Sequence, residues 1–185
     1  DPAVGRDVER FVELPHRLYA GQSAWVPPLR SAERLRLDRR RHPFYDHSDA
    51  EFFVALRDGR VVGRIAALEN RPFNAYHGTN DANFYLWEQE DDAAVAAALF
   101  DRVADWAAAR GLRGLLGPMG FGPLDGHGVL VEGFEHRQTM SMMTWNPPAM
   151  AGLIAGLGFE PAIDFVSFHM SRAGVPVLSE RVRRI

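Results

Sequence analysis

The stretch NFYLWEQEDDAAVAAALFDRVADWAAARGLRGLLGPM, residues 83–119, decides the fold because three elements follow one another in it. Residues 83–89 are rich in aromatic side chains and predict a strand. Asp91 and Asp92 then open a helix. Gly111 ends that helix, and the apolar segment 112–119 predicts a second strand. One face of the helix is apolar, with Val95, Leu99, Val103 and Trp106 at helical spacing.

A strand, a helix and a strand in this order predict a parallel or mixed sheet with a crossover helix. Upstream, residues 50–70 alternate on either side of Asp58-Gly59, which predicts a hairpin. Residues 7–38 predict two short helices, with Pro15 as a kink or break and Pro43 marking the end of the second. Downstream we expect short extended pieces at 128–134 and 140–146, a helix at 147–159 and a final strand at 161–171. The fold class is therefore α/β, a mixed central sheet flanked by helices.

The composition excludes several kinds of chemistry. The 185 residues include no cysteine, which removes disulfides, thiol nucleophiles and thiolate-held metal sites. All 21 basic residues are arginine, which removes Schiff-base lysines and the lysine of a P-loop. The seven histidines are scattered without metal-ligand spacing, so we expect no metal site. A net charge of −3 predicts neither a nucleic-acid partner nor binding to an anionic membrane.

The chain is long enough for one well-buried core. We expect a domain over residues 1–171 and, over 172–185, a linker or the start of a following domain. The N-terminal residues lack the apolar centre of a signal peptide, so we expect a cytoplasmic protein. Abundant arginine, alanine and glycine with no lysine indicate a GC-rich bacterial genome.

The segment NPPAMAGLIAGLGF, residues 146–159, resembles a motif of the GCN5-related N-acetyltransferases (GNAT), matching it at Asn146, Leu153, Gly158 and Phe159. The predicted element order is also similar to the GNAT fold. A wider resemblance, to an uncharacterised bacterial GNAT-like group, covers most of residues 10–170. Its motifs are WVPPL at 25–29, HPF at 42–44, VGRIAA at 62–67, GP at 117–118, LVEGF at 130–134 and NP at 146–147.

The resemblance implies acetyl-CoA or another acyl-CoA as co-substrate, a small-molecule amine as acceptor, and room for a second GNAT-like domain in the same chain. It implies that Asn146 hydrogen-bonds the pantetheine arm, that Trp87 faces the cleft for the acyl or pantetheine group, and that the pyrophosphate lies at the junction of residues 88–94, which includes Gln89. That junction departs from the family because it carries four carboxylates and no glycine. Such carboxylates repel a pyrophosphate unless arginines intervene. Ile154 stands where many members carry a tyrosine that protonates the leaving thiolate.

Amine acylation needs a base that accepts the proton of the ammonium group. Carboxylates and imidazoles near the expected cleft are Glu88, Asp125, His127, Glu132 and His136. Our candidates are Glu88, Asp125 and His127, of which Asp125 and His127 lie two apart in the glycine-rich loop 117–134. The alternative for Asp125 is a turn stabilised by an Asx-type bond. We interpret the loop as a wall on the acceptor side of the site.

These observations support an acyl-CoA-dependent N-acyltransferase that acts on an amine. The alternative is a catalytically silent GNAT-like domain that binds a ligand or packs against an active partner domain. The carboxylate-rich junction and Ile154 favour that alternative.

Overall fold

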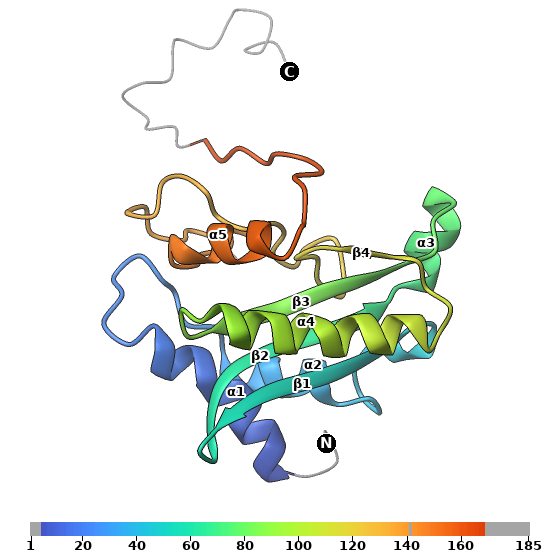
Figure 1. The fold of residues 1–185 in the computed structure, drawn as a ribbon, viewed down its shortest axis with the longest axis horizontal. Helices are drawn as coiled ribbons and strands as arrows, with labels where there is room; N and C mark the ends of the chain where they lie inside the picture. Colours follow the sequence, from blue (N-terminus) through green and yellow to red (C-terminus); the bar gives the residue numbers. More distant parts are fainter. Residues whose placement is uncertain (1–4, 141, 169–185) are drawn as a thin grey trace, which may run out of the picture.

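A computed structural model describes residues 5–140 and 142–168, and Figure 1 shows their arrangement. The helices are α1 (Gly5–Leu18), α2 (Arg30–Leu37), α3 (Arg71–His77), α4 (Ala93–Ala108) and α5 (Ala149–Gly156), with a 3₁₀ turn η1 (Pro43–Asp46). The strands are β1 (Asp49–Arg57), β2 (Arg60–Glu69), β3 (Asp81–Gln89) and β4 (Gly114–Leu116). Together they form one mixed sheet and its covering helices.

The sheet has the strand order β1-β2-β3-β4. β1, β2 and β3 pair antiparallel, and β4 pairs parallel to β3 after the α4 crossover. This confirms the predicted hairpin, with Asp58 and Gly59 at positive φ in its turn, and the predicted strand–helix–strand unit. The α/β class with a mixed sheet is therefore confirmed, while β4 is shorter than the predicted segment 112–119.

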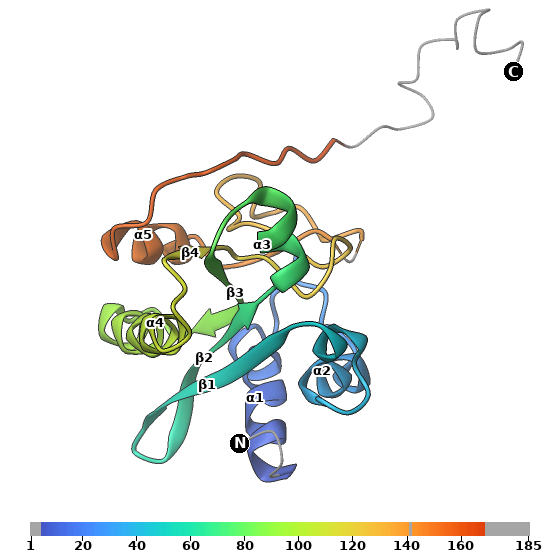
Figure 2. The same cartoon turned by 90° about the vertical axis from the view of Figure 1, so that its right-hand side faces the viewer.

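The helices cover both faces of the sheet, as Figure 2 shows edge-on: α4 and α5 lie on one side and α1 and α2 on the other. On the α4 side, Leu99, Phe100 and Val103 pack on Ile65 and Phe84. On the α1 side, a smaller cluster joins Phe11 and Leu37 to strand residues. The glycine-rich loop contributes Phe121 to this second cluster, where its ring packs against Phe44 at 5.0 Å. The loop is thus anchored in the core.

The structure differs from the expected local structure in several places. α1 runs through Pro15 without a break, and α2 ends at Leu37, well before Pro43. The seven-residue helix α3 was not predicted. Its N-cap is Asn70, whose side chain accepts from the Phe73 amide. The extended pieces expected at 128–134 and 140–146 do not join the sheet over the residues that the structure describes.

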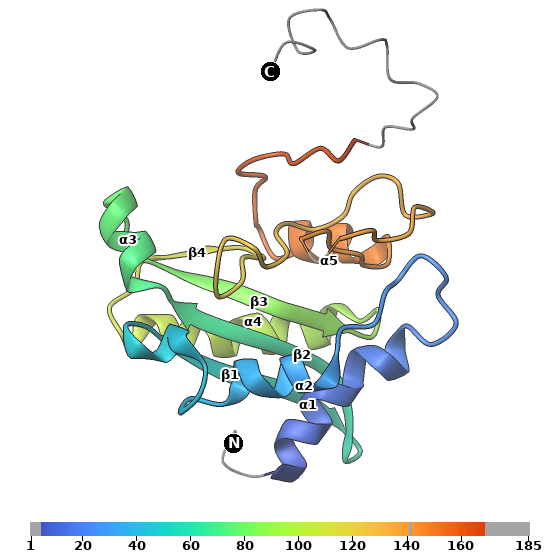
Figure 3. The same ribbon diagram turned by 180° about the vertical axis from the view of Figure 1, so that it is seen from behind.

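The expected final strand at 161–171 is also absent over residues 161–168, where the chain rises away from the sheet with Phe165 and Phe168 exposed (Figure 3). An extended segment becomes a strand only when it finds a ladder partner. In the described part of the chain the sheet ends at the three-residue β4. Residues 169–171 and the expected linker at 172–185 lie outside the described residues.

Candidate functional site

The site begins with an irregularity in β3. Arg64 pairs with Glu88 in the β2–β3 register, but Ala66 pairs with Tyr85, so β3 carries one extra residue. Leu86 lies there with φ of 49°, a left-handed conformation that is costly for a residue with a Cβ. Beyond such a bulge the alternation of side chains changes phase. Glu88 therefore faces the α1 side together with Arg64, while Trp87 and Gln89 face α4.

Glu88 belongs to a largely buried network of five charged residues. The other four are Arg64, Glu33, Arg36 and Asp125. Arg64 Nε donates to Glu88 at 2.6 Å, and its Nη2 donates to Glu33 at 3.2 Å. Arg36 links Glu33 to Asp125, which accepts from Arg36 Nη2 at 2.9 Å. The side chains of Arg64 and Glu33 are only 1% and 2% exposed. Buried charges persist only when paired in this way.

The network brings two of the three predicted catalytic residues into one structure. Glu88 and Asp125 are its two ends, with side chains 21% and 16% exposed. Asp125 has both oxygens engaged, one by Arg36 and the other by the Gly122 amide at 3.0 Å. The second bond joins Asp125 to an amide three residues earlier, so it closes the turn but is not the forward Asx-type bond of the alternative. Within the described residues Glu88 has a hydrogen bond at Oε2 alone, which leaves Oε1 open to a ligand.

His127 lies apart from the network. Its Nε2 is 3.5 Å from the Pro123 carbonyl oxygen, and its ring stacks on Phe165. Asp125 contacts Arg36 and Gly122 and makes no hydrogen bond to His127 in the described part of the chain. The structure therefore does not assemble Asp125 and His127 as a base with its orienting partner.

The predicted cofactor-binding side chains have their polar groups engaged within the protein. Asn146 accepts from the Leu130 amide at 2.7 Å and donates to the carbonyls of Leu130 and Pro147. Trp87 Nε1 donates to Gln89 Oε1 at 2.9 Å, and Gln89 Nε2 donates to the carbonyls of Glu90 and Asp92. These hydrogen bonds fix the backbone just before the N-termini of α4 and α5.

Arginines surround the carboxylates at the start of α4. Arg60 and Arg17 bind Glu90, and Arg57 binds Asp92 at 2.6 Å. Asp92 also caps the helix by accepting from the Ala94 and Val95 amides. The hydrogen bond from Arg57 lowers the pKa of Asp92, and that from Arg60 lowers the pKa of Glu90. The negative charge expected to repel a pyrophosphate is therefore balanced by arginines of α1 and the hairpin.

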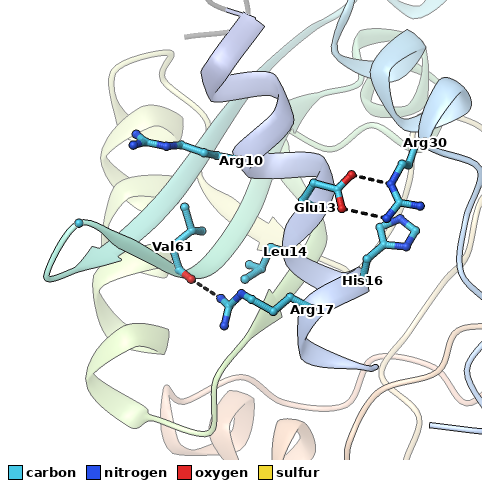
Figure 4. Close-up of a pocket in the computed structure, with 8 residues that line it drawn as sticks. Arg10, Glu13, Leu14, His16, Arg17, Arg30 and Val61 are labelled. Atoms are coloured by element: carbon cyan, nitrogen blue, oxygen red, sulfur yellow. Dashed lines mark hydrogen bonds and ion pairs between the residues drawn. The ribbon is translucent and has the colours of Figure 1, made fainter. Parts of the chain in front are cut away.

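A pocket of about 480 Å³ opens beside this junction, between α1 and the turn of the β1–β2 hairpin (Figure 4). Its lining includes Arg10, Glu13, His16, Arg17 and Arg30. Arg30 binds Glu13 through two hydrogen bonds, and Arg17 donates to the Val61 carbonyl, as Figure 4 shows. Most of the charge at this pocket is therefore committed to contacts within the protein.

An aromatic cluster of Tyr19, Trp25 and Trp145 lies just beyond the C-terminal end of α1. The Tyr19 ring meets the Trp25 and Trp145 rings edge-to-face at 5.3 and 5.2 Å. Trp145 is fixed by a bond from Nε1 to the Phe134 carbonyl at 2.9 Å. Gln138 joins the same loops, because its amide donates to the Ala24 carbonyl and its Oε1 accepts from the Val26 amide. The loop 19–29 is thus tied to residues 134–140 and 142–146.

Sequence reasoning missed the centre of the site. It did not single out Glu33, Arg36 or Arg64 as site residues, nor Tyr19, which directly follows α1. One signal was present: Arg64 interrupts the apolar run of residues 61–68, and an arginine inside a buried strand needs a carboxylate partner. Which carboxylates would meet it depended on pairing across the sheet.

Two further observations concern the part of the chain that the structure describes. No helix over residues 5–140 and 142–168 is long and apolar enough to cross a bilayer. Within the same ranges, no group of three His, Asp or Glu side chains could hold a metal ion.

Comparison with known proteins finds two relatives. The chain is 32% identical over 177 residues to a protein named "Bacterial ceramide synthase" from Caulobacter vibrioides, an alignment that covers 95% of this chain and 46% of that protein. It is 31% identical over 166 residues to "Protein YghO" of Escherichia coli, covering 90% of this chain and 42% of that protein. The chain therefore spans less than half the length of either relative. No family model matches it, and no solved structure does.

Proposed function

We propose that the chain belongs to a GNAT-like N-acyltransferase, which transfers an acyl group from an acyl-CoA to the amino group of a long-chain amine. The observation that carries this proposal is Glu88, a carboxylate at a strand bulge with one oxygen oriented by Arg64 and the other open. The likeness to a protein named for ceramide synthesis supports it, because a ceramide forms by acylation of the amino group of a sphingoid base. That likeness does not favour the catalytically silent alternative.

The chemistry asked of Glu88 is the removal of one proton. An aliphatic amine is protonated at neutral pH and has no lone pair for attack. When the ammonium group gives a proton to Glu88, the nitrogen attacks the thioester carbonyl carbon and a C–N bond forms. The C–S bond then breaks, the nitrogen gives up a second proton and the thiolate takes up one, so that the products are an amide, free CoA and the proton held by Glu88. A positioned base of this kind contributes about 10²–10⁴-fold to the rate.

The junction before α4 supplies charge for the phosphates of the acyl-CoA. The side chains of Arg57 and Arg60 are 48% and 54% exposed, so they are able to exchange a carboxylate for a phosphate partner. Gln89 and Asn146 keep the walls of the cofactor path in place, as their internal hydrogen bonds imply. Asp125 fixes Arg36 and so supports the network behind Glu88.

Ligand-induced stabilisation of the full-length protein tests this proposal. A specific ligand raises the melting temperature once its concentration passes its dissociation constant. We expect long-chain acyl-CoAs and free CoA to raise it, and Arg57→Ala with Arg60→Ala to weaken that response. The matched control is Arg102→Ala, which lies on the exposed face of α4. No shift with any acyl-CoA or with CoA would contradict the proposal.

A further inference from the structure

The hydroxyl group of Tyr19 is buried without a hydrogen-bond partner among the described residues. The residue is only 2% exposed, and its ring packs between Trp25 and Trp145. A buried hydroxyl that makes no hydrogen bond destabilises the folded protein. Phenylalanine would fill the same space without that penalty, so the ring alone does not explain the tyrosine.

Tyr45 shows the usual arrangement in the same protein. It also lies mostly buried, but its hydroxyl donates to the Arg36 carbonyl oxygen at 2.7 Å. Tyr85 is similar, since its hydroxyl accepts from the Gly126 amide at 3.3 Å. Tyr19 therefore differs from two partly buried tyrosines on the same side of the sheet, and an orphaned buried group of this kind needs an explanation, of which a bound ligand is one.

The surroundings of Tyr19 suit a cation. Two half-buried tryptophans stand beside it, and indole rings attract ammonium groups through their π faces. The Glu88 carboxylate acts on the hydroxyl electrostatically: burial first, and the negative charge of Glu88 second, raise the pKa of Tyr19. The hydroxyl thus stays protonated near neutral pH, with an oxygen free to accept from an N–H donor.

A second orphaned atom lies next to this cluster. His16 Nε2 is buried without a partner in the described part of the chain, and the His16 ring meets the Trp25 ring edge-to-face at 5.5 Å. Burial lowers the pKa of His16, which favours its neutral form. A neutral imidazole adds no positive charge that would repel an ammonium group.

We propose that Tyr19, Trp25 and Trp145, together with Glu88, form the subsite that holds the amino group of the acceptor. This inference rests on the proposed function and deepens it, because it places the acceptor on the α1 side of β3. The open oxygen of Glu88 and the Tyr19 hydroxyl accept hydrogen bonds from the ammonium group, and the tryptophans flank it. The same contact positions the nitrogen beside the base that takes its proton.

The test is Tyr19→Phe in the full-length protein, with Tyr45→Phe as the matched control. Octylamine is the probe and octanol its uncharged counterpart, with binding measured by calorimetry. We expect Tyr19→Phe to weaken octylamine binding about tenfold. The melting temperature of the Tyr19→Phe variant should be unchanged or higher, since no hydrogen bond is lost. Tyr45→Phe should lower the melting temperature and leave octylamine binding unchanged.

Three results would overturn the inference: equal octylamine affinity in Tyr19→Phe and the unaltered protein, equal affinity of the unaltered protein for octylamine and octanol, or a fall in melting temperature as large as that of Tyr45→Phe. Acyl transfer to amines is measured separately from octylamine binding. If the unaltered protein binds octylamine through Tyr19 but acylates no amine, the proposed reaction fails while the amine subsite stands. If it acylates amines and Tyr19→Phe has the same KM for them, the subsite alone fails.

Discussion

Arg64 is the residue on which the site depends most. Its guanidinium donates to Glu33, to Glu88 and to the Phe11 carbonyl, and it lies over the Phe11 ring at 4.7 Å. The carboxylates of Glu88 and Glu33 raise the pKa of Arg64 against the opposing effect of burial. One side chain thereby orients the proposed base and neutralises a second carboxylate in the interior.

Replacing Arg64 tests how strongly the network depends on it. We expect Arg64→Met to lower the free energy of unfolding by about 3–5 kcal/mol, because Glu33 is left buried with less compensation. Denaturant unfolding measures the change. The control is Arg102→Ala, whose exposed pair with Asp105 should change stability by less than about 0.5 kcal/mol. A loss below about 1 kcal/mol for Arg64→Met would mean that water reaches Glu33.

At the scale of elements, the close approach of α4 to β2 positions the end of β3. A Cβ on Gly63 would lie 2.8 Å from Val95 Cγ1, 2.9 Å from Leu99 Cδ1 and 3.1 Å from Gln89 Cβ. We expect Gly63→Ala to cost about 1–3 kcal/mol of stability through overpacking. Gly152→Ala is the contrast: this position in α5 has open space, so alanine should gain about 0.5–1 kcal/mol. Thermal unfolding measures the change in stability of both variants. Similar changes for Gly63→Ala and Gly152→Ala would be inconsistent with the packing described.

The contacts at the N-terminus of α4 should make the stability of the protein sensitive to acid. Arginine contacts hold the pKa values of Asp92 and Glu90 below their ordinary 3.8 and 4.5. Groups with lowered folded-state pKa values stabilise the protein fully above their ordinary pKa, and that contribution is lost as pH falls toward the lowered values. We therefore expect the melting temperature to fall below about pH 4. Asp92→Asn, which keeps a capping oxygen without the titration, should show a smaller fall, and an identical pH profile would argue against this role.

The elements differ in how far the sequence predicts them. The hairpin at Asp58-Gly59 and helix α4 follow from local turn chemistry and helical spacing, and both were predicted. The bulge at Leu86 has no local signal, because it arises from the pairing of β3 with β2. The strand expected at 161–171 failed over its described residues because alternation alone cannot supply a ladder partner.

At the scale of the whole molecule, the site combines segments far apart in the chain. Arg36 meets Asp125 across 89 positions, and Arg64 meets Glu33 across 31. Chemical reasoning from residue types selected Glu88 and Asp125 as candidates. Only the fold shows that these two residues lie at opposite ends of the same charge network. The same reasoning paired Asp125 with His127 on spacing alone, and the structure gives each of them different partners.

Amide formation tests the central claim most directly. Full-length protein is given a long-chain acyl-CoA and a sphingoid base, and the amide product is measured by mass spectrometry. We predict that the unaltered protein forms the amide and that Glu88→Gln slows it by about 10²-fold or more without loss of acyl-CoA binding. Glu132→Gln, an exposed carboxylate in the glycine-rich loop, should be close to normal. Amide formation by Glu88→Gln at the unaltered rate would contradict the account.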